Sequence, residues 1–260
     1  MGLIHIPISR VDQKFLNEMQ EYMTHELGNK PNTVRNKLQR FRGLVNEAFK
    51  QGLISKDPYY QFERVKREKV SRAKLGEKEI NRIVNLELEK GSELWHVRNY
   101  FIFSFYMAGI RFSDICTLTP ENLVDGRLKY EMKKTGSTKN IKLLEPAIEI
   151  LKGYNTDKKG YIFPILNEVY KDEFVLRKKI SSKNVIVNRH LKELAKQAKI
   201  DENISFHVSR HSFANYALQK GMGVYSISKA LAHSNLKTTE VYLKSFDEEL
   251  LDNEMENIFK

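Results

Sequence analysis

The sequence predicts a mainly α-helical protein with one small β-sheet, an α+β fold. Three observations support this prediction. Apolar residues recur at helical spacing through most of the chain. Breaks rich in Gly, Pro and Asn separate these stretches. One pair of segments, between residues 128 and 144, alternates apolar and polar residues as two paired strands do. With 260 residues, the chain has room for one large domain and a smaller one.

Two helices are expected at the N-terminal end, over residues 12–27 and 32–51. The break Gly28–Pro31 separates them, and Gly52 stands where a C-terminal cap belongs. The second helix carries polar and basic side chains near its start, which suit contact with phosphates or a DNA groove. An ordinary amphipathic helix with a solvated basic face is the alternative. The candidate contacts here are Arg35, Lys37 and Arg40.

A strongly basic segment, RVKREKVSRAK over residues 64–74, follows the second helix. So many cations with few apolar residues favour a linker that lies along a polyanion, with Lys66 and Arg67 as candidate contacts. We place a domain boundary near Ser71, which gives domains over residues 1–70 and 71–260.

Helices are expected again over 77–88 and 94–108, and Gly109 ends the second. A further helix over 112–118 would put Arg111 at a corner, beside a helix N-terminus that suits a phosphate. Asp114 lies one turn further on and could orient the guanidinium. The alternative is a structural Arg111–Asp114 pair at the surface, which would add little stability.

Residues 128–133 and 140–144 are expected to form a β-hairpin around the turn 135–138. Lys133, Lys134 and Lys139 would lie at its tip, where a basic loop without further function is the alternative. A short helix over 145–153 and a loop-rich stretch over 154–182 follow, with a buried strand end at 161–164. A helix over 185–198 comes next.

The stretch Ser205–Ser245 gathers the strongest chemical candidates. His207 and Arg210 share one helix face at H-x-x-R spacing. His233 follows, and Tyr242 comes nine residues later, after a Thr238–Thr239 pair that resembles a helix start. Each element alone is weak, since a basic chain with seven histidines can show H-x-x-R by chance. Together they predict a site that binds and attacks a phosphate.

The charge of the chain points to a polyanionic partner. The net charge is +11, and residues 247–260 contribute −5, so residues 1–246 carry +16. Such a surface attracts nucleic acid, although a solvated basic surface is the alternative. The single cysteine excludes an intrachain disulfide and a Cys-based zinc site. No stretch has the length of a membrane span or the pattern of a signal peptide, so we expect a cytoplasmic, nucleoid-associated protein.

An ordered set of residues resembles the tyrosine recombinases of the phage integrase family. The phrases that carry the resemblance are AGIRFSDICTLTPENL (108–123), KKTGSTKNIKL (133–143), FHVSRHSFANYAL (206–218) and LAHSNLKTTEVYL (231–243). The resemblance covers the chain from about Phe15 onward. Ala232 stands where the family usually has glycine, and Gly76 where its first catalytic-domain helix usually has a hydroxyl N-cap. The resemblance implies that residues 1–70 are part of a SAM-like, core-binding DNA-binding domain that is shorter than is usual in the family.

The resemblance also implies roles. Tyr242 attacks the scissile phosphorus and forms a 3′-phosphotyrosyl link, while Arg111 and Arg210 hold the non-bridging oxygens. Lys134 protonates the leaving 5′-oxygen, with Lys139 as the lesser alternative; His207 assists proton transfer, and His233 bonds the phosphate or Tyr242. Asp114 supports the first arginine. No cofactor or metal ion is implied, because the arginine pair takes the role that metal ions play elsewhere.

The expected function is therefore site-specific DNA recombination, for a mobile element. A strand-passing type IB topoisomerase relative, and a non-catalytic DNA-binding or excision-control protein, are the alternatives. The resemblance implies a monomer in solution that forms a homotetramer on synapsed double-stranded DNA. Residues 247–260 would form a tail helix that docks on a neighbouring protomer or packs back on its own domain.

Overall fold

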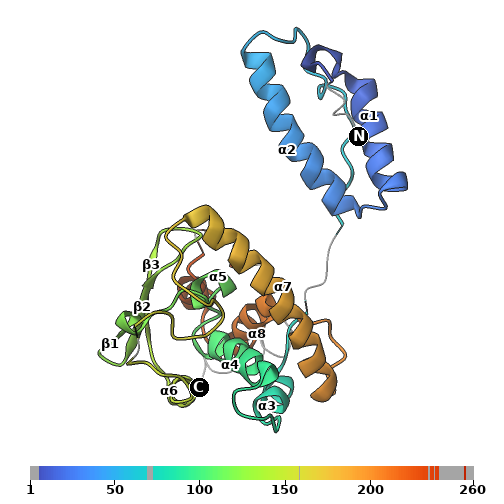
Figure 1. The fold of residues 1–260 in the computed structure, drawn as a ribbon. Coiled ribbons are helices and arrows are strands. Elements are labelled where there is room, and N and C mark those ends of the chain that lie inside the picture. Colours follow the sequence, from blue (N-terminus) through green and yellow to red (C-terminus); the bar gives the residue numbers. More distant parts are fainter. Residues whose placement is uncertain are drawn as a thin grey trace. The chain divides into compact units, whose positions relative to one another are not determined.

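The computed structural model describes residues 6–68, 73–157, 159–233, 235–236, 238–239 and 255. The chain divides into two compact units, residues 1–71 and 72–260. Each unit has its own hydrophobic core (Figure 1).

The N-terminal unit consists of two main helices and an extended segment that returns along them. Helix α1 (Gln13–Glu21) begins at Asp12, whose side chain accepts a hydrogen bond from the Phe15 N–H at 2.8 Å. It continues into the π-helical turn η2 (Tyr22–Glu26), and α2 spans Pro31–Lys50. A short 3₁₀ turn, η1 (Ile8–Arg10), precedes α1. Both predicted helices are thus confirmed, because their apolar stripes are the faces that meet in the core of this unit.

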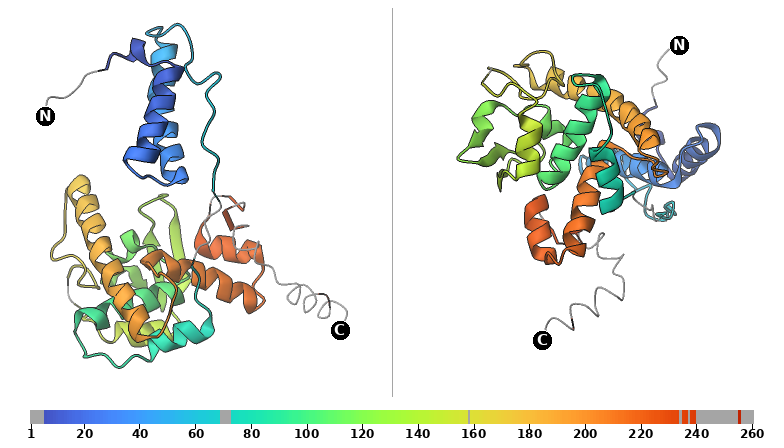
Figure 2. Two further views of the ribbon diagram at one scale, coloured as in Figure 1. Left: turned by 90° about the vertical axis from the view of Figure 1, so that its right-hand side faces the viewer. Right: turned by 90° about the horizontal axis from the view of Figure 1, so that it is seen from below.

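The C-terminal unit is built around α4 (Glu93–Tyr106), which is buried on almost every side. Figure 1 shows it in the middle of the unit, where its most extensive contacts are with four other helices. These are α3 (Glu77–Val84), α6 (Glu145–Leu151), α7 (Glu173–Gln197) and α8 (Phe206–Gln219). Helix α9 (Val224–Leu231) lies beside α8, as the two views of Figure 2 show. No helix within the described residues has the length and apolarity needed to cross a bilayer.

A three-stranded antiparallel sheet stands at the edge of this unit, in the order β1-β2-β3. The strands are β1 (Leu123–Val124), β2 (Arg127–Glu131) and β3 (Thr138–Lys142), and the 3₁₀ turn η3 (Pro120–Asn122) precedes them. In the β2–β3 hairpin Tyr130 pairs with Lys139, and Glu131 with Thr138. The predicted hairpin is confirmed, whereas the two-residue strand β1 is too short to show a periodic pattern.

Some boundaries predicted from the sequence are wrong. Helix α7 begins at Glu173, so residues 173–182 are helical and not loop. The Asp172 carboxylate accepts hydrogen bonds from the N–H groups of Phe174 and Val175. Exposed lysines separate the buried apolar residues of α7, which hid the helical period. The expected strand end at 161–164 is buried at Phe163 but forms no strand.

Two predicted helices are also shorter than expected. Helix α3 ends at Val84, and α5 spans only Phe112–Ile115. Helix α5 therefore ends four residues after Arg111, and the chain then reaches the sheet through η3.

Candidate active site

A tight turn between α4 and α5 forms the floor of the candidate site. Ala108 and Gly109 both have left-handed backbone angles, with φ of 54° and 64°. A Cβ on Gly109 would lie 2.7 Å from the Cα of Arg210, so this position needs glycine both for its backbone and for its packing. The turn directs two backbone carbonyls, those of Ala108 and Gly109, toward α8 and the hairpin.

Arg210 reaches this turn from α8 and is only 3% exposed. One of its guanidinium nitrogens donates to the Gly109 carbonyl at 2.9 Å, and the other donates to the Leu231 carbonyl at the end of α9. Helix α8 is held nearby by Ser209, whose hydroxyl lies 2.7 Å from the Ser104 hydroxyl of α4. The planar guanidinium is thus fixed in orientation by two elements, as a bidentate anion ligand needs to be.

Lys139 approaches the same turn from β3. Its side chain is 4% exposed, and its ammonium donates to the Ala108 carbonyl at 3.2 Å. Burial, the largest effect, and the positive charges of Arg210 and Arg111 together lower the pKa of Lys139 to about 7, against the opposing effect of Asp114.

Lys133 and Lys134 differ from Lys139, because both are exposed at the start of the hairpin turn. The structure therefore brings Lys139 among the arginines and leaves the Lys134 side chain at the surface. The resemblance gave Lys139 the lesser role. Its inward position on β3 depends on the register of the hairpin, which the sequence alone does not fix.

Arg111 is the N-cap residue of α5 and is partly buried. Its guanidinium lies 3.1 Å from the Met132 sulfur, a weak acceptor, and it interacts electrostatically with the Asp114 carboxylate. Arg111 and Arg210 both act electrostatically on Lys139 and on His233, which places the four side chains in one site.

Asp114 is 2% exposed, and its carboxylate accepts hydrogen bonds from the Lys133 backbone N–H at 3.0 Å and from the Ser113 hydroxyl at 3.4 Å. It therefore fastens the hairpin to α5, and it affects Arg111 through its charge. Burial raises the pKa of the Asp114 carboxyl, which the Lys133 N–H and Arg111 oppose.

The two predicted histidines occupy different surroundings. His207 is exposed on α8, one turn from Arg210, and its ring makes an edge contact with the His211 ring at a centroid distance of 4.6 Å. His233 is partly buried after α9, with its Nδ1 atom 2.9 Å from the Thr239 hydroxyl. Burial and the nearby charges of Arg210 and Arg111 lower the pKa of His233 to about 4. His233 is consequently neutral at pH 7 and can donate or accept a hydrogen bond.

Thr239 is a member of the site that sequence reasoning did not identify. It is 1% exposed, and its hydroxyl fixes the orientation of the His233 ring. The sequence signal was the Thr238–Thr239 pair, which predicted only a helix start. Tyr242 and the tail over 247–260 lie outside the described residues, apart from Met255.

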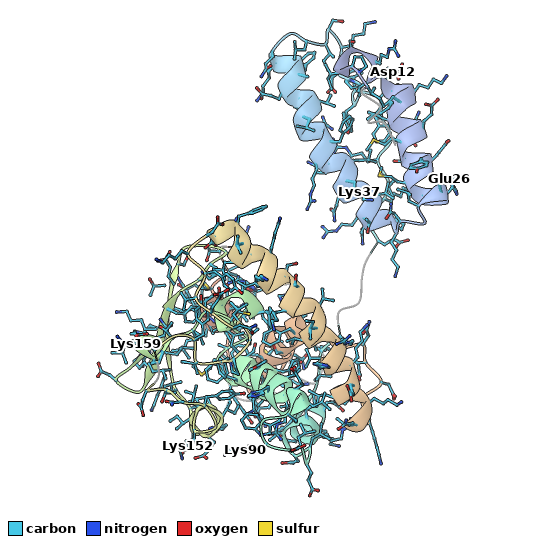
Figure 3. All side chains as sticks on the ribbon, in the orientation of Figure 1. Asp12, Glu26, Lys37, Lys90, Lys152 and Lys159 are labelled. Carbon is cyan, nitrogen blue, oxygen red and sulfur yellow. The ribbon has the colours of Figure 1, made fainter. Side chains whose placement is uncertain are left out.

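The predicted DNA contacts of the N-terminal unit divide into two groups. Lys37, labelled in Figure 3, is exposed, as are Arg40, Lys66 and Arg67. Arg35 is partly buried and donates to the Val65 carbonyl at 2.9 Å, so it holds the basic segment against α2. Asn32 makes two further bonds to the backbone of Glu68 in the same segment.

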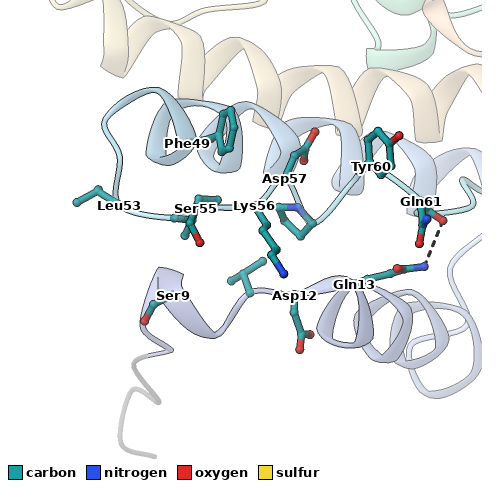
Figure 4. Close-up of a pocket in the computed structure, with 13 residues that line it drawn as sticks. Ser9, Asp12, Gln13, Phe49, Leu53, Ser55, Lys56, Asp57, Tyr60 and Gln61 are labelled. Carbon is teal, nitrogen blue, oxygen red and sulfur yellow. Dashed lines mark hydrogen bonds between the residues drawn. The ribbon is translucent and has the colours of Figure 1, made fainter.

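The described residues also include a hollow in each unit. One, of about 800 Å³, lies in the N-terminal unit, where Gln13 donates to the Gln61 carbonyl at 3.2 Å (Figure 4). The other, of about 350 Å³, lies beside Asp114 and Tyr130. Neither contains Arg210 or His233, and no group of His, Cys, Asp or Glu in the described part of the chain is arranged to hold a metal ion.

The fold is α+β, and a helix, a hairpin and a turn bring Arg210, Lys139 and Arg111 together in it. The sequence profile of the Phage integrase family matches residues 73–249, and that of the Phage integrase SAM-like domain matches residues 2–67. The first match covers more than half of the 260 residues, so the chain belongs to the phage integrase family.

Relatives of this chain carry the name tyrosine recombinase. One from Thermosipho africanus is 32% identical over 149 residues, which is 56% of this chain and 49% of the relative. Tyrosine recombinase XerA from Pyrococcus furiosus is 32% identical over 144 residues, 54% of this chain and 47% of the relative. XerC from Neisseria meningitidis serogroup B is 27% identical over 219 residues, 82% of this chain and 69% of the relative. The first two matches thus span about half the length of those relatives.

Solved structures share the fold. A lambda integrase dimer bound to a COC′ core site has a TM-score of 0.69 at 19% identity, covering 93% of this chain and 82% of that chain. The Tn1549 transposon integrase in complex with circular intermediate DNA has a TM-score of 0.70 at 17% identity, covering 96% of this chain and 87% of that chain. At these identities the likeness establishes the fold.

Proposed function

We propose that this chain is a site-specific DNA recombinase that cleaves and rejoins DNA through a 3′-phosphotyrosyl intermediate. The observation that carries the proposal is the burial of Arg210 and Lys139 at one turn, beside Arg111 and with Asp114 as the acidic group that acts on them. Burying several like charges is costly unless an anion joins them. A DNA phosphate in that position would be held without a metal ion.

Tyr242 is the proposed nucleophile. Its oxygen forms a bond to phosphorus as the bond to the 5′-oxygen breaks, and the link conserves the energy of the phosphodiester, so no cofactor is required. Arg111 and Arg210 would stabilise the charge on the non-bridging oxygens. A lysine of the hairpin would protonate the leaving oxygen, and the resemblance points to Lys134.

The histidines would complete the reaction. His233, neutral because its pKa is lowered to about 4, would hydrogen-bond the phosphate or the tyrosine through Nε2, the ring nitrogen that does not face Thr239. His207, exposed one turn before Arg210, would assist proton transfer. Asp114 would support this group by fixing α5 to the hairpin.

The proposed partner is double-stranded DNA. The lambda and Tn1549 integrases, which share the fold, were solved with a COC′ core site and with circular intermediate DNA. Residues 1–70 would act as a partial core-binding domain, with residues 71–260 as the catalytic domain and 247–260 as its tail helix. Lys37, Arg40, Lys66 and Arg67 would contact phosphates, with Arg35 fixing the segment that carries the last two, and Lys133 and Lys139 would contribute from the hairpin.

Lambda integrase was solved as a tetramer bound to a Holliday junction. This supports a homotetramer of the present chain on synapsed DNA, which we expect to form from monomers in solution. The same proposal predicts that the protein is associated with the nucleoid and that a mobile element encodes it. The non-catalytic alternative keeps the DNA contacts but not the chemistry.

Trapping on a nicked duplex tests the proposal. The substrates are nicked duplexes that together cover the DNA flanking the gene. When such a duplex is cleaved, a short fragment is lost and the strand cannot be rejoined, so the covalent adduct persists. A denaturing gel detects it. Wild type is expected to form the adduct on one site, and Tyr242→Phe is expected to form none while retaining its gel-shift affinity. Binding without any wild-type adduct would favour the non-catalytic alternative, and relaxation of supercoiled DNA without strand exchange would favour the topoisomerase relative.

A further inference from the structure

A polar hollow of about 350 Å³ lies in the C-terminal unit, where α5, the hairpin and the start of α7 meet. The side chains that line it include Asp114 of α5, Tyr130 and Glu131 of β2, and Glu173 and Leu176 of α7. The two arginines and the buried lysine of the candidate active site do not line it. The hollow therefore shares Asp114 with that site but none of its three cations.

Two buried polar atoms of the residues that line this hollow have no hydrogen-bond partner among the described residues: Asp114 Oδ2 and the Tyr130 hydroxyl. The bonds that the Asp114 carboxylate accepts, from the Lys133 backbone N–H and the Ser113 hydroxyl, both go to Oδ1. Asp114 is 2% exposed and Tyr130 is 6% exposed. Burying a polar atom without a partner is costly, so a ligand that bonds both atoms would be stabilised.

The charges around the hollow favour a cationic ligand. Three carboxylates line it, those of Asp114, Glu131 and Glu173, against one ammonium group, that of Lys133. Glu173 also forms an ion pair with Arg177 at 3.3 Å, but both side chains are largely exposed and such a pair is weak. The hollow thus keeps an acidic lining.

The lining also has a place for an apolar chain between two charges. Asp114 is buried, whereas Glu131 and Glu173 are exposed, so the carboxylates lie at two depths. Leu118 and Leu176 supply apolar surface in the same lining. Three tyrosines line the hollow as well, and the faces of aromatic rings attract cations.

We propose that this hollow binds an aliphatic diamine or polyamine. One ammonium group would donate to Asp114 Oδ2 and the Tyr130 hydroxyl, and the next would lie between Glu131 and Glu173. An ammonium has the N–H donors that these oxygens need. A metal ion fits less well, because the described residues include no group of His, Cys, Asp or Glu arranged to hold one. The inference does not rest on the proposed recombinase function.

The bound amine would act on the hairpin through Asp114. Burial raises the pKa of the Asp114 carboxyl, and an ammonium beside it would lower that pKa again. The carboxylate would then stay ionised, and a charged acceptor strengthens the bond from the Lys133 N–H at 3.0 Å. The ligand would therefore fasten the hairpin more firmly to α5.

Calorimetric titration of the full chain with 1,4-diaminobutane, without DNA, tests the proposal. At an ionic strength of about 0.15 M, which screens exposed charges, we expect saturable binding with a Kd of about 1 mM or tighter. 1-Aminobutane, with one ammonium group, should bind about 10-fold more weakly. Tetramethylammonium has no N–H donor and should not saturate the site. Failure of 1,4-diaminobutane to saturate by about 10 mM would overturn the proposal.

Three variants locate the binding. Tyr130→Phe removes one hydroxyl with little change of shape, and should weaken binding by about 5- to 10-fold. Asp114→Asn keeps an oxygen for the Lys133 N–H but loses the charge, and should weaken binding by about 30-fold or more. Glu121→Gln is the matched control, because Glu121 is an exposed acid of η3 that does not line the hollow, although Asn122 beside it does. Its affinity should equal that of wild type.

The NMR signal of the Lys133 backbone N–H gives a local readout. It should shift as the amine saturates wild type, and should not shift in Asp114→Asn. Equal affinities in Tyr130→Phe and Glu121→Gln, with an unmoved Lys133 signal in wild type, would place the amine elsewhere and overturn the proposal. If circular dichroism shows that Asp114→Asn does not fold, the other two variants decide the question. Adduct formation enters none of these measurements, so failure of the recombinase proposal would leave this inference standing.

Discussion

Two buried polar clusters contact α4, and they have opposite electrostatic characters. Near the start of the helix, His96, Asn99 and Tyr100 meet Tyr154: the His96 Nδ1 atom lies 3.1 Å from the Tyr154 hydroxyl, to which the Asn99 amide donates at 3.4 Å. Burial raises the pKa of Tyr154 and lowers that of His96. All these groups are therefore neutral at pH 7. His96 and Asn99 both hydrogen-bond the Tyr154 hydroxyl, and the Asn99 side-chain oxygen accepts from Arg98 at 3.2 Å.

Among the described residues, the cluster beyond the other end of α4 has more cationic than acidic side chains. Arg210, Lys139 and Arg111 gather around the turn that follows the helix, and Asp114 is the acidic group acting on them. Backbone carbonyls hold Arg210 and Lys139, but a carbonyl carries only a partial charge. The comparison teaches that a self-contained polar cluster stabilises a fold, whereas one with excess charge is preorganised for a ligand.

Replacing an arginine in each cluster should separate the two roles most strongly. Arg210→Lys is expected to slow adduct formation by at least about 100-fold, because an ammonium cannot bond two carbonyls and a phosphate with the geometry of the planar fork. The rate of adduct formation on a nicked duplex is the measurement.

Arg98→Lys is the matched control for this variant. Arg98 is partly buried beside the neutral cluster and also bonds a backbone carbonyl, that of Leu86 at 2.9 Å. The Arg98→Lys substitution should lower the free energy of unfolding slightly and leave the rate of adduct formation at the wild-type value. Near-normal activity in Arg210→Lys would remove Arg210 from the phosphate clamp.

The excess charge should also cost stability, and Lys139→Met measures that cost. Methionine fills a similar volume without the buried charge, so the free energy of unfolding is expected to rise by about 1–3 kcal/mol at pH 7. The folded-state pKa of about 7 lies below the usual value for lysine, so the wild type gains stability as the pH rises from about 7 to 10 and the variant does not. Urea unfolding at pH 7 and pH 9.5 checks both statements; a destabilised variant would contradict them.

The neutral cluster should respond in the opposite direction. Tyr154→Phe removes the hydroxyl that His96 and Asn99 share, and is expected to lower the free energy of unfolding by about 1 kcal/mol. The rate of adduct formation should not change. Urea unfolding and the trapping assay together check this, and a change in rate with unchanged stability would show that the two clusters are coupled.

The sequence predicted those features of the two clusters that depend on residues close together in the chain. The H-x-x-R spacing placed His207 and Arg210 on one helix, and the alternating segments predicted the hairpin. The inward position of Lys139 depends on how β2 pairs with β3, because a one-residue change of register would turn its side chain outward. The Thr239 bond to His233 likewise depends on the fold after α9. Helix α7 shows a different limit, since its lysine-rich outer face concealed where the helix begins.

The two histidines of the clusters give the smallest expected effect, and the one that most directly separates the clusters. The pKa of His96 and that of His233, the latter about 4, are both lowered by burial, so the unfolded chain takes up their protons first as the pH falls below about 6.5. Stability should therefore be independent of both groups above pH 6.5 and decline below it. His96→Asn and His233→Asn should each make the free energy of unfolding decline less between pH 6.5 and pH 5.

Sulfate distinguishes the two contributions, because an anion in the cationic cluster would raise the pKa of His233 but not that of His96. With sulfate present, the difference in pH dependence between wild type and His233→Asn should shrink, and the difference between wild type and His96→Asn should persist. General effects of the salt on stability cancel in each comparison with wild type. An equal change in both differences would mean that the charged cluster holds no anion, and the electrostatic contrast between the two clusters would then carry no functional meaning.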